Sequence, residues 1–199
     1  YFCKGMAYNV EFHLINPTKA EVVYEDRSVT VSSIPLRHRI PTCGFLFAEK
    51  PTPNHIIRDM IDFYKVPVFE LNRIKNGEDY VLPDGTVIPN NRLTTPPAPP
   101  RSYAYCSDTI FHRPIIEQIK GVNLLFHEAT FAQCDAQRAK ETFHTTAMQA
   151  GEIARDADVK QLLIGQFSAR YEDENILLQE ARSVFPNTLL AKENLKVTL

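Results

Sequence analysis

Strand-like and helix-like segments alternate from Ser102 to the C-terminus, and this alternation constrains the fold more than any other feature of the sequence. Short apolar runs typical of buried strands are separated by segments whose apolar residues recur at helical spacing. Helices placed in this way cover the sheet that the strands build, so the pattern favours an α/β layer. Thr145 or Thr146 would cap the second helix, and Pro186 would end the third. We predict strands over residues 102–106, 123–127 and 161–166, and helices over residues 114–120, 145–156 and 173–184.

The first fifty residues are typical of β structure. Residues 10–15 and 28–34 alternate loosely between apolar and polar side chains, as half-buried strands do. Residues 43–48 form an apolar run that suits a buried strand, and Pro35 and Pro41 bend the chain between these segments.

The segment from residue 51 to residue 100 has a different composition, because it holds nine of the chain's 14 prolines. A helix over residues 54–64, with Asn54 as its N-cap, and a hairpin turn over residues 82–87 are the elements that we predict here. We interpret residues 51–97 as an inserted arm, and residues 1–50 and 98–199 as one domain that the arm interrupts.

Composition bounds the class of protein. The 199 residues, 44% hydrophobic and 23% charged, suit one globular domain, or a domain with an appendage. The net charge of −2 gives no overall basic field for a nucleic acid. The four cysteines have no CxxC spacing, so they indicate neither a zinc ribbon nor a redox dithiol. They are too scattered for a disulfide scaffold, and we expect reduced thiols in a cytoplasmic protein. No apolar run approaches the roughly 20 residues of a membrane helix.

Polar side chains recur at the ends of the predicted strands. His38, Asp108, the pair His127 and Glu128, and Gln166 each follow or end an apolar run. In α/β sheets, ligands gather at the carboxyl ends of the strands. Imidazole and carboxylate groups both suit zinc, so these positions could form a metal site.

Each of these residues also has an ordinary structural interpretation. A lone histidine after a strand is more often a surface or capped residue, and Asp108 could simply cap a turn. His144 could begin the helix that follows it, and Glu128 could be a solvated carboxylate. Arg170 and Tyr171 could serve only for surface packing. The order of the residues along the chain is more specific than any one of them.

That order resembles the ribonuclease Z family, the zinc-dependent endonucleases that trim tRNA 3′ ends and form a branch of the metallo-β-lactamase fold. The resemblance covers the chain from about Val29 to its end. It implies the C-terminal half of an αββα sandwich with an inserted arm. The matching segments are PLRH at 35–38 with Pro41 and CGF at 43–45, YCSDT at 105–109, FHEATF at 126–131, HTTAMQA at 144–150 and LLIGQFSARY at 162–171.

The resemblance implies a role for each matching residue. His38 would bind the first of two zinc ions, and Asp108 would bridge both. His144, with Glu128 and the neighbouring His127, would support the leaving group or the transition state. The reaction would be hydrolysis of a phosphodiester by a metal-activated hydroxide between two metals about 3.5–4 Å apart.

Two departures from the family pattern limit this expectation. The principal motif, His-x-His-x-Asp-His, is absent, because no two of the six histidines lie two residues apart. Gln166 stands where the family has a histidine that binds the second zinc, and an amide oxygen is a poor substitute for imidazole. We therefore expect this chain to bind zinc weakly or not at all and to be inactive alone. The missing N-terminal half would lie upstream or on a second polypeptide.

Partners follow from the same resemblance. Precursor tRNA would be the substrate, the arm would grip it, and the whole protein would form a homodimer. Residues 51–97 include five basic and six acidic residues, so their charge gives no support for RNA binding by the arm. We name Arg170, Lys65 and Arg73 as candidate RNA contacts. Two alternatives stay open: a non-catalytic RNA- or protein-binding relative, and another phosphodiesterase of the same fold.

Overall fold

The computed structural model describes residues 7–199. The chain divides into two compact units. The first joins the part up to Ala48 with Arg101–Leu199, and the second is Glu49–Pro100. Within the described residues, no helix combines the length and the apolar character needed to cross a membrane.

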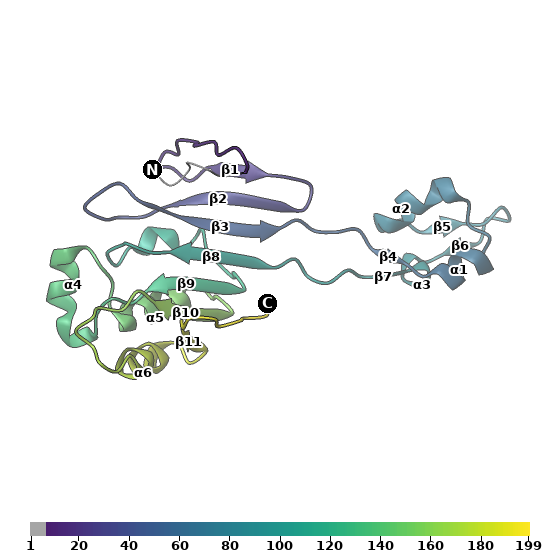
Figure 1. The fold of residues 1–199 in the computed structure, drawn as a ribbon. Coiled ribbons are helices and arrows are strands. Elements are labelled where there is room, and N and C mark those ends of the chain that lie inside the picture. The colour runs from purple at the N-terminus through teal and green to yellow at the C-terminus, as the bar shows by residue number, and fades with distance from the viewer. Residues whose placement is uncertain (1–6) are drawn as a thin grey trace. The chain divides into compact units, whose positions relative to one another are not determined.

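The first unit is built on a seven-stranded sheet with the order β1-β2-β3-β8-β9-β10-β11 (Figure 1). Strand β1 pairs with β2, and β3 with β8, in antiparallel fashion, whereas β8, β9, β10 and β11 run parallel. The carboxyl ends of the parallel strands therefore meet at one edge. The strands are β1 (Val22–Glu25), β2 (Val29–Pro35), β3 (Cys43–Glu49), β8 (Ser102–Cys106), β9 (Leu124–Glu128), β10 (Gln161–Gly165) and β11 (Thr188–Leu190).

Helices cover one face of this sheet. Thr146 begins α5 (Ala147–Asp156) with a capping box: its hydroxyl accepts from the Gln149 backbone, and the Gln149 side chain accepts from the Thr146 backbone. Helix α6 (Asn175–Val184) packs closely on α5 at Gly151, where an added Cβ would lie 2.9 Å from the Ala181 carbonyl oxygen. The remaining helical segments are α4 (Ala136–Thr142), η2 (Arg113–Ile115) and η3 (Gln133–Asp135).

The opposite face of the sheet carries aromatic side chains. Strand side chains alternate between faces, and the wholly buried Ala104, Cys106 and Leu125 belong to the helix-covered core. Their neighbours along the strands point the other way. Phe47 stacks on Tyr103, and Tyr105 stacks on Phe126. We call Phe45, Phe47, Tyr103, Tyr105 and Phe126 the aromatic face; Phe47 and Tyr105 are each 40% exposed.

The second unit has a small core of its own, formed by Ile61, Val66, Ile74, Tyr80, Ile88 and Leu93. Two short antiparallel pairs frame it, β4 (His55–Ile56) with β7 (Thr94–Thr95) and β5 (Tyr80–Val81) with β6 (Val87–Ile88). Its helical segments are α1 (Arg58–Phe63), η1 (Val68–Glu70), α2 (Leu71–Lys75) and α3 (Asn90–Leu93).

The strand predictions from residue 28 onward and the hairpin turn over residues 82–87 are confirmed. So are the two helices that Thr146 and Pro186 were expected to delimit, since α5 begins after Thr146 and α6 ends before Phe185. Residues 10–15, however, form no strand, so the loose alternation of their side chains was misleading there. The remaining short segments were not predicted; they are β1, β4, β7, β11, α2, α3, α4, η1 and η3.

Two helix predictions were wrong in detail. Asn54 does not cap α1, which begins after Ile57. The Asn54 side chain instead donates to Asn90 and Thr94, and the next two residues pair with β7. Residues 114–120 form no α-helix: the single 3₁₀ turn at Arg113–Ile115 continues only as turns.

Candidate metal and catalytic site

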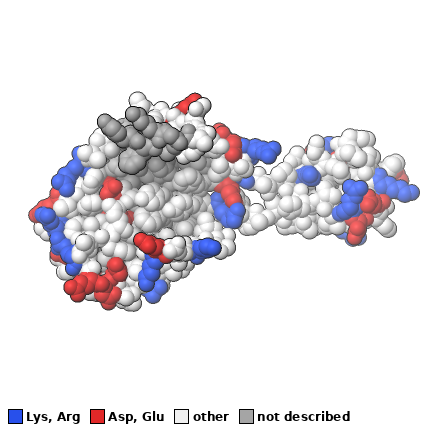
Figure 2. Space-filling view, viewed as in Figure 1, with Lys and Arg blue, Asp and Glu red and all other residues white. Residues whose placement is uncertain are grey.

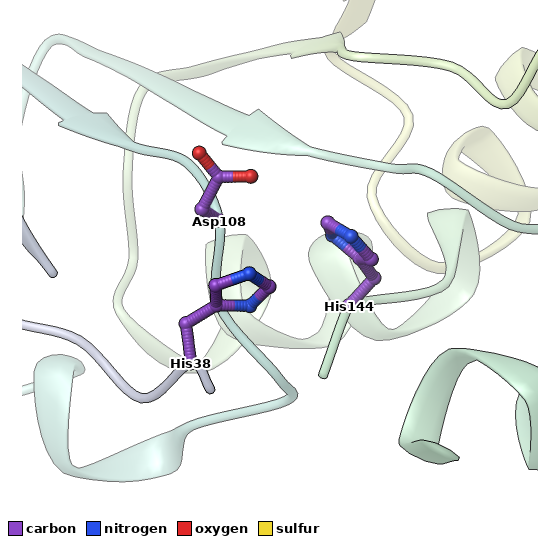
Figure 3. A group of neighbouring side chains, drawn as sticks. All are labelled: His38, Asp108 and His144. Atoms are coloured by element: carbon purple, nitrogen blue, oxygen red, sulfur yellow. The ribbon is translucent and has the colours of Figure 1, made fainter. Parts of the chain in front are cut away.

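Most of the candidate site residues lie at the edge of the sheet where the parallel strands end. Asp108 follows β8, Glu128 ends β9 and Gln166 follows β10. His38 comes from the loop between β2 and β3, and His144 from the connection between α4 and α5. His38, Asp108 and His144 lie around a common point (Figure 3), and one potential ligand atom from each lies within 4.8 Å of the others.

His38 is oriented by a backbone oxygen. Its Nδ1 lies 2.9 Å from the carbonyl oxygen of Phe143. A carbonyl can only accept, so Nδ1 carries a proton, and in the neutral ring the lone pair is then on Nε2. Histidines that bind metals are commonly fixed in this way through their second nitrogen. The ring centroid of His38 lies 5.1 Å from that of His144, which places the two imidazoles side by side.

His144 is held by a buried carboxylate. Its Nδ1 lies 2.9 Å and 3.1 Å from the two oxygens of Glu128, whose side chain is wholly buried. The same carboxylate accepts from the Thr109 and Thr145 backbone amides and from the Thr130 hydroxyl. The hydrogen bond with Glu128 raises the pKa of His144 above its usual value, against the effect of burial. With Nδ1 occupied by Glu128, Nε2 is the nitrogen free to act on a ligand.

Asp108 and Gln166 interact directly. The Gln166 amide nitrogen donates to Asp108 Oδ1 over 2.6 Å, and the Ser107 hydroxyl donates to the Gln166 amide oxygen. Both residues adopt left-handed backbone conformations, with φ of 55° at Asp108 and 59° at Gln166. One oxygen of Asp108 is therefore engaged by an amide that carries no charge.

His127 lies outside this group. It is wholly buried, its Nδ1 donates to the Glu128 carbonyl oxygen over 2.8 Å, and burial lowers its pKa. Its Nε2 has no hydrogen-bond partner among the described residues. The alternation along β9 places it on the same face as Leu125, under the helices.

The three candidate RNA contacts lie in different settings. The Arg170 guanidinium lies 5.0 Å from the centroid of the Phe131 ring and 3.2 Å from Asp135, and the Phe131 ring lies 6.2 Å from that of His144. Arg73 and Lys65 belong to the second unit, where Arg73 pairs with Glu70 and Glu78. On the face drawn in Figure 2, basic and acidic side chains are interspersed.

Several groups that shape the site were not singled out from the sequence. The Phe143 carbonyl and the Thr109 and Thr145 amides are backbone groups, which carry no residue-type signal. Phe131 was visible only as the last letter of FHEATF, and nothing in that motif indicated its contact with Arg170.

No protein-family model matches the chain. A curated relative named ribonuclease Z, from Phocaeicola vulgatus, is 71% identical over all 199 residues. The curated relatives that match the whole chain carry the name ribonuclease Z. The chain spans 64% of the length of the Phocaeicola relative.

Solved structures show the fold of the chain. It is similar to human tRNase Z, short form, at TM-score 0.53 and 20% identity, over 92% of this chain and 47% of that one. It is also similar to YhfI of Bacillus subtilis, a metallo-β-lactamase fold protein, at TM-score 0.54 and 16% identity, over 89% and 52% of the two chains. The predicted α/β, metallo-β-lactamase-like fold class is therefore confirmed.

Proposed function

We propose that this chain is part of a metal-dependent endoribonuclease that removes the 3′ trailer of precursor tRNA by hydrolysing one phosphodiester bond. The single observation that carries the proposal is the convergence of His38, Asp108 and the Glu128-bound His144 on one point. The name of the 71% identical relative also supports the proposal, because a ribonuclease Z is by its name a ribonuclease.

The side chains present fit one metal ion in part. His38 offers the lone pair of Nε2, and Asp108 offers the carboxylate oxygen that Gln166 leaves free. Zinc accepts both types of ligand, and a catalytic zinc usually has three protein ligands. A bound zinc would supply hydroxide at neutral pH and would polarise the phosphate. A second metal does not fit at Gln166, because its amide nitrogen faces Asp108 as a donor.

His144 would serve the leaving group. Glu128 holds Nδ1, so Nε2 can carry a proton to the 3′ oxygen of the tRNA as the phosphorus–oxygen bond breaks. The tRNA would keep a 3′ hydroxyl, and the trailer would keep the phosphate. Nine-tenths or more of the Glu128 and His127 side chains is buried, so Glu128 would act through His144 and His127 would support the same loop.

The remaining ligands would come from outside this chain. We propose that a missing N-terminal half carries them and covers the aromatic face, which is otherwise a partly exposed apolar surface on a folded sheet. The second unit would contact tRNA as an exosite through Lys65 and Arg73, with Arg170 nearer the site, and the whole protein would act as a cytoplasmic homodimer. The isolated chain would then be inactive.

A chimera tests the proposal. The part of the Phocaeicola relative that lies outside the matched region would be joined to this chain, and cleavage of a precursor tRNA would be compared with cleavage of bis-nitrophenyl phosphate. We expect the chimera to cut the precursor once and the isolated chain to cut neither. His144→Ala should abolish cleavage, whereas His13→Ala, a change at an exposed histidine, should leave it unchanged.

A second candidate function rests on Gln166. If the whole protein binds RNA without cutting it, the family fold has become a binding module, as the loss of a ligand histidine would favour. Binding of precursor tRNA by the chimera without any metal-dependent cleavage, in zinc or manganese, would establish that alternative and contradict the endonuclease proposal.

A further inference from the structure

We propose that a cavity beside His144 binds a single nucleotide of the RNA, with its base against Phe111 and its phosphate near Lys140. The cavity has a volume of about 390 Å³ and is lined by Ile110, Phe111, Gln137, Lys140, His144 and Gln149, among others. The inference rests on the proposed function, because it deepens the same site by assigning it a substrate pocket.

The position of the cavity connects it to the reacting groups. His144 belongs both to its lining and to the cluster with His38 and Asp108. A nucleotide in the cavity would therefore lie next to the phosphodiester on which His144 acts. The volume is at the small end of the range for ligand pockets, roughly 300–1,000 Å³, which suits one nucleotide and excludes a duplex.

The apolar part of the lining suits a flat base. Phe111 and Ile110 lie side by side, and the backbone of Ile110 is fixed by its hydrogen bond to the Arg37 carbonyl oxygen. Phe111 also packs against the main core, so its ring is held in place before any ligand arrives. Nucleic-acid-binding proteins use such fixed aromatic rings to stack single-stranded bases, whatever the base.

Gln149 contributes a directed donor. Its Oε1 accepts from the Thr146 backbone in the capping box, which commits the oxygen and orients the side chain. The amide nitrogen then offers only N–H donors, so Gln149 selects a hydrogen-bond acceptor such as a base carbonyl or ring nitrogen. Gln137, by contrast, already donates to Glu141.

Lys140 supplies the positive charge. It projects from α4, is exposed and forms no ion pair with any described residue. The Lys140 ammonium can meet a phosphate, while the aromatic ring and the oriented amide can meet the face and the edge of a base. This combination suits a nucleotide better than an apolar molecule or a bare anion.

Binding of a labelled single-stranded RNA tetranucleotide to this chain, compared with its abasic counterpart, tests the assignment. We expect the intact RNA to bind about 5- to 150-fold more tightly than the abasic one, the range that base stacking supplies. Phe111→Leu should remove most of this difference. Lys140→Gln should weaken the binding of both RNAs equally. Lys120→Gln removes the same charge outside the cavity and should weaken the binding of neither.

The variant Gln149→Glu tests the donor separately. Its carboxylate can still accept from the Thr146 backbone and preserve the helix cap, but the N–H donors are lost. Equal binding of intact and abasic RNA, or full competition by inorganic phosphate alone, would overturn the assignment and leave an anion site only.

The chimera separates this inference from the function on which it rests. Phe111→Leu should raise the KM for precursor tRNA at least fivefold and change kcat little. Cleavage by the Phe111→Leu chimera with an unchanged KM would contradict the nucleotide pocket and leave the endonuclease proposal standing. The opposite result is also possible: Phe111→Leu abolishes the preference for intact over abasic RNA, but the chimera without this substitution does not cleave. That result would support the nucleotide pocket and contradict the endonuclease proposal.

Discussion

Gln166 donates a hydrogen bond to Asp108 over 2.6 Å, at the point where strands β8 and β10 both end. The pair explains how the site accommodates a residue that is a poor zinc ligand. An amide nitrogen cannot bind a cation, but it can satisfy a carboxylate oxygen that would otherwise lack a partner. We therefore expect the site to keep its geometry but to bind metal weakly.

Replacing this amide with imidazole should therefore restore metal binding. We expect the isolated chain to hold less than one equivalent of tightly bound zinc, and Gln166→His to raise the zinc affinity about tenfold or more, because a third nitrogen or oxygen ligand completes a usual catalytic set. Competition titration with a zinc-binding dye would measure this. Gln166→Ala removes the same hydrogen bond without adding a ligand and should gain nothing. Tight, stoichiometric zinc in the unmodified chain would contradict the prediction.

Glu128 should be the most sensitive polar residue of the site. Glu128→Gln would set an NH₂ group against donors that now point at a carboxylate, and each unsatisfied buried group costs about 1–3 kcal/mol. We expect the free energy of unfolding to fall by about that amount, measured by urea denaturation. Glu141→Gln, on an exposed residue of α4, should change it by less than about 0.5 kcal/mol. Equal effects of the two changes would show that the buried network contributes no stability.

The parts of this site that the sequence could predict are those set by strand ends. Asp108, Glu128 and Gln166 follow or end apolar runs, so they were expected at the carboxyl ends of strands. The structure places them there, where the parallel strands β8, β9 and β10 end together. The neighbours of His144 depend on backbone groups and on the path of α4, which was not predicted. Periodicity also failed where an element needs a distant partner: β11 has three residues, and Asn54 faces Asn90 and Thr94, far along the chain.

His127 should make stability depend on pH. Its pKa in the folded chain lies below the ordinary 6.5, because burial disfavours the charged form. Below pH 6.5 the unfolded chain takes up a proton that the folded chain does not, so the free energy of unfolding falls as the pH drops. This contribution is fully present above pH 6.5 and is lost as the pH falls through the folded-state pKa.

Denaturation at pH 7.5, 6.5 and 5.5 with EDTA would measure the effect. His127→Asn, whose amide can still donate to the Glu128 carbonyl, should flatten the slope by up to about 1.4 kcal/mol per pH unit. His13→Asn, at an exposed position, should leave the slope unchanged. His144 has the opposite sign, since its raised pKa gives stability that is lost as the pH rises, and it therefore cannot produce a loss on the acid side.

The aromatic face should drive self-association of the isolated chain. Phe47 and Tyr105 belong to neighbouring strands and are each 40% exposed, on a sheet face that the described helices do not cover. Phe47→Ser with Tyr105→Ser should shift the chain toward the monomer in sedimentation velocity runs, because contiguous apolar surface promotes association. Phe69→Ser removes an aromatic side chain that is more exposed but belongs to the second unit, and it should leave association unchanged. If Phe69→Ser disperses the chain and the double variant does not, the aromatic face is not the contact surface, and the proposal that a missing half of the fold covers it loses its physical basis.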